Sequence, residues 1–230
     1  MYHWIKDKEF LRNMRTLCSD LVNQLVVAIN NDDEYEVEAH MVGSGAKHLE
    51  TQNSNEPVDL DYNLNIIESK QMPLEDINEE DIKEYVRKEF NKILNKNDIG
   101  DCSDSTSCLT TPRMHFETGN QTEFSIDLAI VYEESDGTWF RLIHQKTGNT
   151  HTDAWFWNEA PHSNGLEEKV SRIKEDGHWN DVRDTYLDKK NLYLTKNDHN
   201  HPSFICYIEA VNEVYDKNYK SQKKQKTLFY

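Results

Sequence analysis

Two acidic residues lie one residue apart in the stretch Val58–Ile66, where polar and apolar side chains alternate. Alternate side chains of a β-strand point to the same face, so Asp59 and Asp61 would lie side by side there. Two like charges at that spacing repel each other, which favours a cation between them. The stretch therefore predicts a strand with one cation-binding face and one apolar face.

A second alternating stretch, Phe124–Val131, supplies another acidic residue, Asp127. If this strand pairs beside the first, Asp127 completes a cluster of three carboxylates with Asp59 and Asp61. Oxygen ligands suit a hard divalent ion, and Mg²⁺ fills its remaining positions with water and substrate phosphate. We therefore expect Asp59, Asp61 and Asp127 to bind two Mg²⁺ ions, with Mn²⁺ as a substitute, about 4 Å apart around a phosphoryl group.

A glycine-serine turn, Gly43-Ser44, follows the strand-like segment 35–42, and it is the only Gly-Ser dipeptide in the sequence. Backbone N–H groups at such a turn, together with a hydroxyl, can bind phosphate oxygens. We expect Gly43 and Ser44 to contact the phosphates that the metal ions activate. Lys47 could approach a phosphate or remain solvated.

A calcium-binding EF-hand loop also begins with the pattern Asp-x-Asp-x-Asn, which residues 59–63 match. That loop requires Gly at its sixth position and a bidentate Glu at its twelfth. Leu64 and Lys70 occupy those positions, so the pattern excludes this calcium site.

Gly43-Ser44, Asp59-x-Asp61 and Asp127, in this order, resemble the signature of the DNA polymerase β-like nucleotidyltransferases over about residues 35–135. The resemblance implies an α+β fold with a mixed β-sheet core and flanking helices. It also implies metal-dependent transfer of a nucleoside monophosphate from a nucleoside triphosphate such as ATP to a hydroxyl, with release of pyrophosphate. The three aspartates would then be catalytic as well as metal-binding, with Asp127 as the general base.

Residues 182–191 and 202–211 resemble the helical lobe of the oligoadenylate-synthase and bacterial cyclic-dinucleotide-synthase branch. This similarity implies that Lys189 or Lys190, and Ser203, contact the triphosphate. Judged from residue type alone, they could equally be a solvated lysine pair and a serine at a helix N-cap.

Periodic apolar residues predict amphipathic helices over 7–30 and 79–96, and the charged face of the second is typical of ordinary solvation. Residues 97–110 have no periodicity and predict a polar loop. Further strands are expected at 111–117 and 123–132, forming a hairpin turned at Gly119-Asn120, and at 138–145. The aromatic run 155–157 favours packing over contact with a base.

Helical patterns replace strands after Pro161, at 166–174, at 179–190 and from Pro202 onward. The sequence therefore predicts a catalytic core at 1–158 and a smaller C-terminal helical lobe at 159–230 that closes the nucleotide cleft. The histidines within 198–201 favour a polar loop rather than a metal site, and the lysine-rich tail 217–226 predicts loose order.

The chain of 230 residues carries a net charge of −16, which argues against docking on duplex nucleic acid. A triphosphate neutralised by metal ions remains compatible with that charge. The four cysteines form no Cys-x-x-Cys pair, and the longest aliphatic run, 25–29, is too short to span a bilayer. We expect a cytoplasmic protein with no membrane association.

Three functions agree with these features. The chain could join nucleotides to one another as a second-messenger or oligonucleotide synthase, or transfer a nucleotide to an antibiotic, a protein or an RNA end. It could also be a non-catalytic nucleotide-binding module, which the presence of all three aspartates disfavours. The preferred base and the acceptor stay open.

Overall fold

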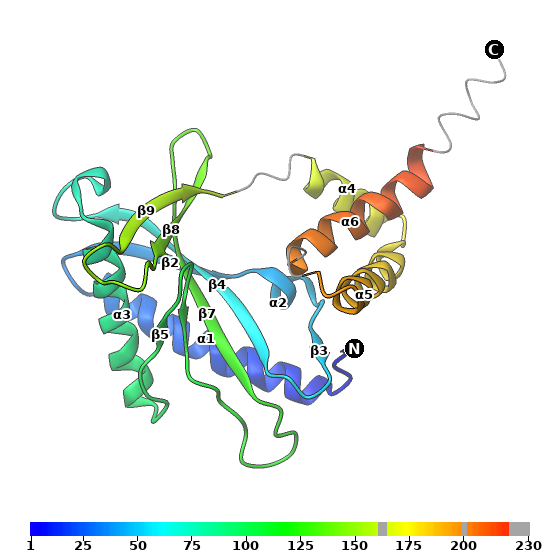
Figure 1. Cartoon of the computed structure of the whole chain (residues 1–230), viewed down its shortest axis with the longest axis horizontal. Coiled ribbons are helices and arrows are strands. Elements are labelled where there is room, and N and C mark those ends of the chain that lie inside the picture. Colours follow the sequence, from blue (N-terminus) through cyan, green and yellow to red (C-terminus); the bar gives the residue numbers. More distant parts are fainter. Residues whose placement is uncertain (161–164, 199–201, 221–230) are drawn as a thin grey trace. The chain divides into compact units, whose positions relative to one another are not determined.

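A computed structural model describes residues 1–160, 165–198 and 202–220, which form two compact units. The first comprises Ile5–Glu50 and Asn55–Ala160, and contains a mixed sheet with helices. The second comprises Met1–Trp4, Thr51–Ser54 and the chain from Pro161 onward, and is mostly helical. This combination of helices and a mixed sheet confirms the predicted α+β class (Figure 1).

Seven strands form the sheet of the first unit, in the order β2-β4-β7-β6-β5, with β8 pairing β7 and β9 pairing β8. The pair β4 and β7 is parallel and the other pairs are antiparallel. The strands are β2 (Tyr35–Met41), β4 (Val58–Ser69), β5 (Ser103–Asp104), β6 (Leu109–Thr110), β7 (Phe124–Glu133), β8 (Trp139–Gln145) and β9 (Ala154–Glu159).

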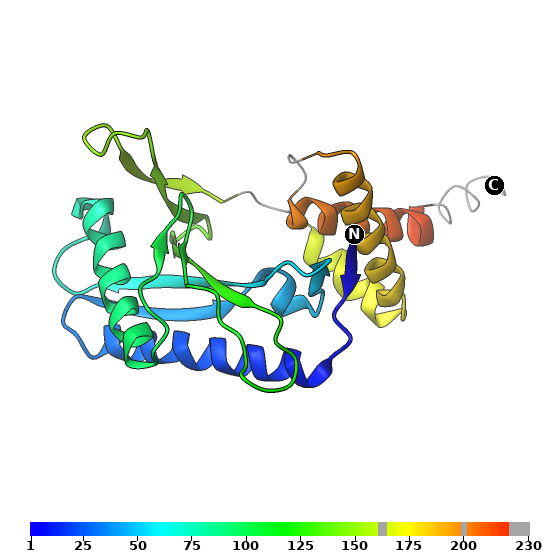
Figure 2. The ribbon, with the colours of Figure 1, turned by 60° about the horizontal axis from the view of Figure 1, so that its bottom comes forward.

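Helices α1 (Lys8–Asn30) and α3 (Glu79–Lys96) pack against this sheet, and α1 runs along one face of it (Figure 2). Both begin at a polar cap. Asp7 accepts a hydrogen bond from the N–H of Phe10, and Asn78 accepts one from the N–H of Glu80. The apolar stripes of the helices are buried, as the periodicity predicts.

The apolar side chains of β4 pack against the helices, and this determines which face of the strand points to the core. Leu60, Tyr62, Leu64 and Ile66 are buried, which confirms the apolar face predicted for this strand. Each such side chain contributes about 1.5–3 kcal/mol when it is removed from water. A shift of one residue would exchange the two faces, so the core holds Asp59 and Asp61 on the opposite face.

The structure corrects two sequence predictions beside β7. Residues 111–117 form no strand, and the predicted hairpin is reduced to a single bridge between Met114 and Phe124. On this side β7 pairs instead with β6, an antiparallel strand inside the segment 97–110 predicted to be a loop. Strands of two residues are too short to show alternation, so β5 and β6 leave no periodic pattern in the sequence.

The aromatic run in β9 divides between core and surface. Trp155 and Trp157 pack against the hydrophobic core, whereas Phe156 is 37% exposed. The packing interpretation therefore describes two of the three rings.

The second unit contains α4 (Leu166–Glu175), α5 (Trp179–Thr195), α6 (Ser203–Tyr215) and a π-helical turn at Asp216–Lys220. This unit also includes two segments from outside the predicted lobe at 159–230. They carry β1 (Tyr2–Trp4) and β3 (Thr51–Asn53), which pair with each other. A role in closing a nucleotide cleft stays a prediction. Residues 199–201 and 221–230, which hold the histidine loop and most of the lysine tail, lie outside the described residues.

Across residues 1–160, 165–198 and 202–220, no helix combines the length and the hydropathy needed to cross a membrane.

Candidate active site

The register of β4 and β7 brings the three predicted aspartates together. Asp61 lies opposite Asp127 in the parallel ladder, and Asp59 lies opposite Ser125. Residues paired in this way share a face of the sheet, because side chains alternate along both strands. All three carboxylates therefore project from the face of β4 and β7 that is turned away from the core.

The clustering of charge is visible in the pKa values of two of these carboxyls. The pKa of Asp61 is raised to about 6, first by burial and then by the charges of Asp127 and Asp59, against the opposing effect of Arg141 and Lys47. The pKa of Asp59 is also raised, first by partial dehydration and then by the charge of Asp127. Asp59 is exposed, so this second effect is screened by water.

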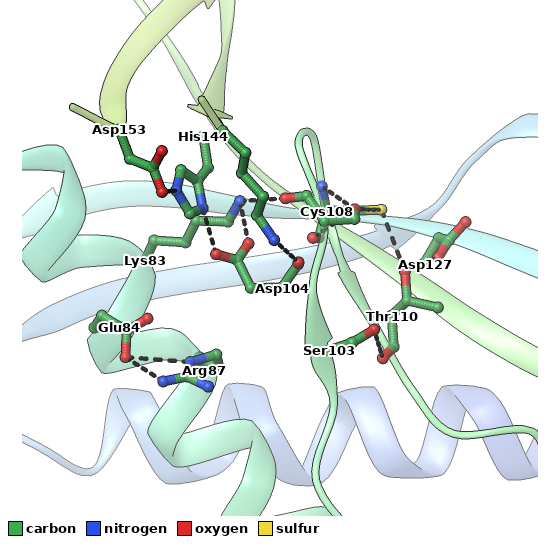
Figure 3. Close-up of polar contacts among 12 residues, drawn as sticks. Lys83, Glu84, Arg87, Ser103, Asp104, Cys108, Thr110, Asp127, His144 and Asp153 are labelled. Atoms are coloured by element: carbon green, nitrogen blue, oxygen red, sulfur yellow. Dashed lines mark hydrogen bonds and ion pairs between the residues drawn. The ribbon is translucent and has the colours of Figure 1, made fainter. Parts of the chain in front are cut away.

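Two hydroxyl groups on neighbouring strands hold two of the carboxylates. The Ser125 hydroxyl donates a hydrogen bond to Oδ1 of Asp59. The Thr110 hydroxyl donates one to Oδ1 of Asp127 at 2.5 Å, and Figure 3 shows these two residues. Each donor is the cross-strand neighbour of the aspartate it contacts. Sequence reasoning missed Thr110, since it lies in the segment predicted to be a loop.

The glycine-serine turn lies against Asp61. The N–H of Val42 donates to the carbonyl oxygen of Asp61 at 2.8 Å, and α2 (Gly43–Lys47) begins at the next residue. Gly43 has a φ of +61°, and a Cβ there would lie 2.4 Å from Oδ2 of Asp61. Only glycine allows the main chain to come this close to the carboxylate.

Ser44 follows Gly43 in the first turn of α2, where a phosphate contact was predicted. Its carbonyl oxygen accepts a hydrogen bond from the N–H of Leu49, which ties the end of the helix to its start. Lys47 extends over the same turn, with Nζ 3.4 Å from the carbonyl oxygen of Gly43. Phosphate binding by Gly43 and Ser44 stays a prediction.

The donor set at these strands fits a divalent cation. Three carboxylates share one face, and Gly43 keeps side-chain bulk away from Asp61. The pKa of Asp61 is raised first by burial and then by repulsion from Asp127 and Asp59, and a cation would offset that repulsion. Across the described residues, however, no three acidic, His or Cys side chains are gathered into a metal-ligand group. Binding therefore requires the carboxylates to turn toward one another about the Ser125 and Thr110 contacts.

The other predicted nucleotide-binding residues lie in the helical unit. Lys189 forms an ion pair with Glu213 at 2.8 Å, and Nζ of Lys190 lies 3.9 Å from the centre of the Tyr2 ring. Ser203 is the first residue of α6, whose N-cap is Pro202, so the alternative of an N-cap serine is wrong. Contact of Lys189, Lys190 or Ser203 with a triphosphate stays a prediction.

Comparison with known proteins places the fold. No protein-family model and no curated protein sequence matches the chain. Among solved structures, CdnC of Escherichia coli MS115-1 with ATP is similar at a TM-score of 0.55 and 14% identity, over 92% of this chain and 62% of that one. Escherichia coli DncV with 3′-deoxy GTP is similar at 0.52 and 12% identity, over 80% of this chain and 61% of that one.

Both solved structures are bacterial cyclic dinucleotide synthases of the nucleotidyltransferase superfamily. The chain therefore shares the fold of these two structures, which confirms the α+β fold expected from the resemblance of Gly43-Ser44 and the aspartates. It spans about three-fifths of the length of these two proteins.

Proposed function

We propose that the protein is a metal-dependent nucleotidyltransferase that moves a nucleoside monophosphate from a nucleoside triphosphate to a hydroxyl acceptor. The observation that carries the proposal is the pairing of Asp61 with Asp127, which gathers three carboxylates on one face beside Gly43. A core strand has no structural need for such a cluster, because like charges at so short a distance repel each other and destabilise the fold. The nucleotidyltransferase fold supports the same chemistry.

The three carboxylates share one part in this reaction, and Asp127 has a second. Asp59, Asp61 and Asp127 would hold Mg²⁺ or Mn²⁺, which when bound neutralises phosphate charge and acidifies the acceptor hydroxyl. The Thr110 hydroxyl occupies Oδ1 of Asp127, so Oδ2 is the oxygen that accepts the acceptor's proton. The acceptor oxygen then bonds to the α-phosphorus as the bond to pyrophosphate breaks.

The start of α2 would bind the triphosphate during this displacement. Backbone N–H groups at Gly43 and Ser44 suit the negative oxygens of a phosphate chain, and Lys47 adds a positive charge to the same turn. Because Val42 and Gly43 contact Asp61 directly, the phosphates and the carboxylates would be held at a fixed spacing.

The acceptor that we favour is a second nucleotide, which would make the protein a nucleotide second-messenger synthase. The two similar structures support this choice, since both belong to synthases of that kind and were solved with ATP or 3′-deoxy GTP. The net charge of −16 also favours small acceptors over duplex nucleic acid.

The test is incubation of the purified protein with the four α-³²P-labelled triphosphates and Mg²⁺ or Mn²⁺, with no other acceptor. We expect a phosphatase-resistant nucleotide product and pyrophosphate. Asp127→Asn should form neither, whereas Asp20→Asn, which removes an exposed charge from α1, should behave as wild type. A product formed equally well by Asp127→Asn would contradict the proposed role of this site.

An outcome with no product from any triphosphate mixture would reject the synthase. Adding non-nucleotide hydroxyl acceptors, such as aminoglycosides, tyrosine-containing peptides or RNA ends, then tests transfer to those classes.

A further inference from the structure

A buried ionic network lies beside the carboxylates, on the segment from Ser103 to Thr110 that carries β5 and β6 (Figure 3). The Lys83 side chain is only 2% exposed, although it comes from the face of α3 predicted to be solvated. Its ammonium group lies 2.6 Å from Oδ1 of Asp104 and donates a hydrogen bond to the carbonyl oxygen of Ser105 at 2.7 Å. Lys83 therefore holds the chain of this segment at two consecutive residues.

His144 on β8 holds the same segment from the other side. Its Nδ1 lies 2.5 Å from Oδ2 of Asp104, and its Nε2 lies 3.3 Å from Oδ2 of Asp153. The imidazole stacks on Trp155 with ring centres 4.1 Å apart, and the backbone N–H of His144 donates to the carbonyl oxygen of Thr106 at 2.7 Å. Asp104 is thus shared between a helix and a strand that are distant in sequence.

The far end of this segment contacts the candidate active site. Ser105 accepts a hydrogen bond from the N–H of Cys108 at 3.2 Å, and its hydroxyl donates to the Cys108 carbonyl oxygen at 2.9 Å. Sγ of Cys108 lies 3.6 Å from the hydroxyl oxygen of Thr110, which donates to Asp127. A continuous series of polar contacts therefore runs from Lys83 to the carboxylate of Asp127.

Burying the ion pair of Lys83 and Asp104 costs free energy, and structural support alone does not explain why the protein keeps it. Removing Lys83 and Asp104 from water is unfavourable, and apolar side chains of similar size often stabilise a buried site better. Burial lowers the pKa of Lys83 against the opposing effect of Asp104, which is the signature of that cost. A strand of two residues has few ladder hydrogen bonds, so β6 needs such anchors if Thr110 is to be held in one place.

We propose that Thr110 is a positioning residue, which fixes the carboxylate of Asp127 through the segment anchored by Lys83, Asp104 and His144. With Oδ1 held by the hydroxyl, Oδ2 is left for the divalent cation and for the acceptor's proton. The inference rests on the proposed function for its catalytic meaning, while its effect on cation binding can be measured separately.

The neighbouring residue provides a matched control. Thr111 is buried at 4% exposure, and its hydroxyl oxygen accepts a hydrogen bond from the backbone N–H of Ile126 at 2.9 Å. Thr111→Val therefore removes a hydroxyl from the residue directly after Thr110, which also contacts β7, without removing a contact to a carboxylate. Thr110→Ser keeps the hydroxyl that Thr110→Val removes.

The experiment measures Mn²⁺ affinity by the electron paramagnetic resonance of free Mn²⁺, and then kcat and KM with the labelled triphosphates. Thr110→Val should weaken Mn²⁺ binding and lower kcat by about 10–100-fold, the usual effect of losing a partner of a metal ligand. KM for the triphosphate should change less than about twofold if ground-state binding is untouched. Thr110→Ser should restore both properties, and Thr111→Val should lower the urea midpoint while leaving Mn²⁺ affinity unchanged.

Mn²⁺ affinity in Thr110→Val equal to that of wild type would overturn the inference. An equal loss in Thr111→Val would also overturn it, because general loosening of the sheet would then explain the effect. Suppose that neither wild type nor any variant forms product, and that only Thr110→Val loses Mn²⁺ affinity. The positioning of Asp127 by Thr110 is then supported, and the proposed function fails. If the wild-type protein binds no Mn²⁺, the cation site is rejected, and the proposed function and the positioning role of Thr110 fail with it.

Discussion

The carboxylate cluster should weaken the protein whenever no cation is bound, and Asp61→Asn should relieve that weakness. Dehydration and two neighbouring charges raise the pKa of Asp61 from 3.8 to about 6. Each pKa unit corresponds to about 1.4 kcal/mol, so the ionised side chain costs the folded state about 3 kcal/mol at neutral pH. Asparagine keeps the shape of the side chain and removes the charge.

The effect has a defined pH dependence. The folded protein holds the Asp61 proton more tightly than the unfolded chain does, so this group's stabilising contribution is complete below pH 3.8 and is lost as pH rises through 6. The gain from Asp61→Asn should therefore be full at pH 7.5, partial at pH 5 and nearly absent at pH 4. Urea unfolding in the presence of EDTA measures it at each pH.

Two controls isolate the cause. Asp20→Asn changes the net charge equally but removes an exposed carboxylate, so it should leave the free energy of unfolding within about 0.5 kcal/mol of wild type. Millimolar Mg²⁺ at pH 7.5 should stabilise wild type and not Asp61→Asn. If Asp61→Asn is no more stable than wild type in EDTA at pH 7.5, the cost inferred for the dehydrated and repelled Asp61 carboxylate is wrong.

Three other substitutions test separate parts of the structure. Gly43→Ala should lower the free energy of unfolding by at least about 1–2 kcal/mol, because alanine is strained in the left-handed backbone conformation. It should also abolish turnover, because the new Cβ would lie 2.4 Å from Oδ2 of Asp61. A variant as stable as wild type in thermal unfolding would contradict this. Asp104→Asn should cost about 3–5 kcal/mol in urea unfolding by leaving buried Lys83 without its anion, and a loss below about 1 kcal/mol would reject the network. Asp127→Asn should retain binding of a non-hydrolysable triphosphate in calorimetry while losing product formation; loss of binding would show that Asp127 mainly holds the ground state.

Long, strongly patterned elements were predictable from the sequence. The stripe of α1 and the alternation of β4 and β7 each repeat over many residues, and burial in a single core agrees with them. Alternation also assigned Asp61 and Asp127 to polar faces. The sequence does not specify that these two residues lie opposite each other, because a period of two leaves the register between neighbouring strands open.

The contacts that hold Asp127 could not be predicted from the sequence, for identifiable physical reasons. Strand β6 has two residues, too few for any periodicity. Lys83 belongs to a helix face whose composition is typical of solvation, and only the distant residues Asp104 and His144 explain its burial. Contacts between segments so far apart in the chain depend on tertiary packing rather than on local pattern.

The most direct measurement is Mn²⁺ binding to wild type and to the single variants Asp59→Asn, Asp61→Asn and Asp127→Asn. A shared site predicts that each substitution weakens Mn²⁺ affinity and that Asp20→Asn leaves it unchanged. Asp127 is the critical variant, since it comes from a different strand than the other two. Mn²⁺ affinity in Asp127→Asn equal to that of wild type would contradict a cation site built from both strands.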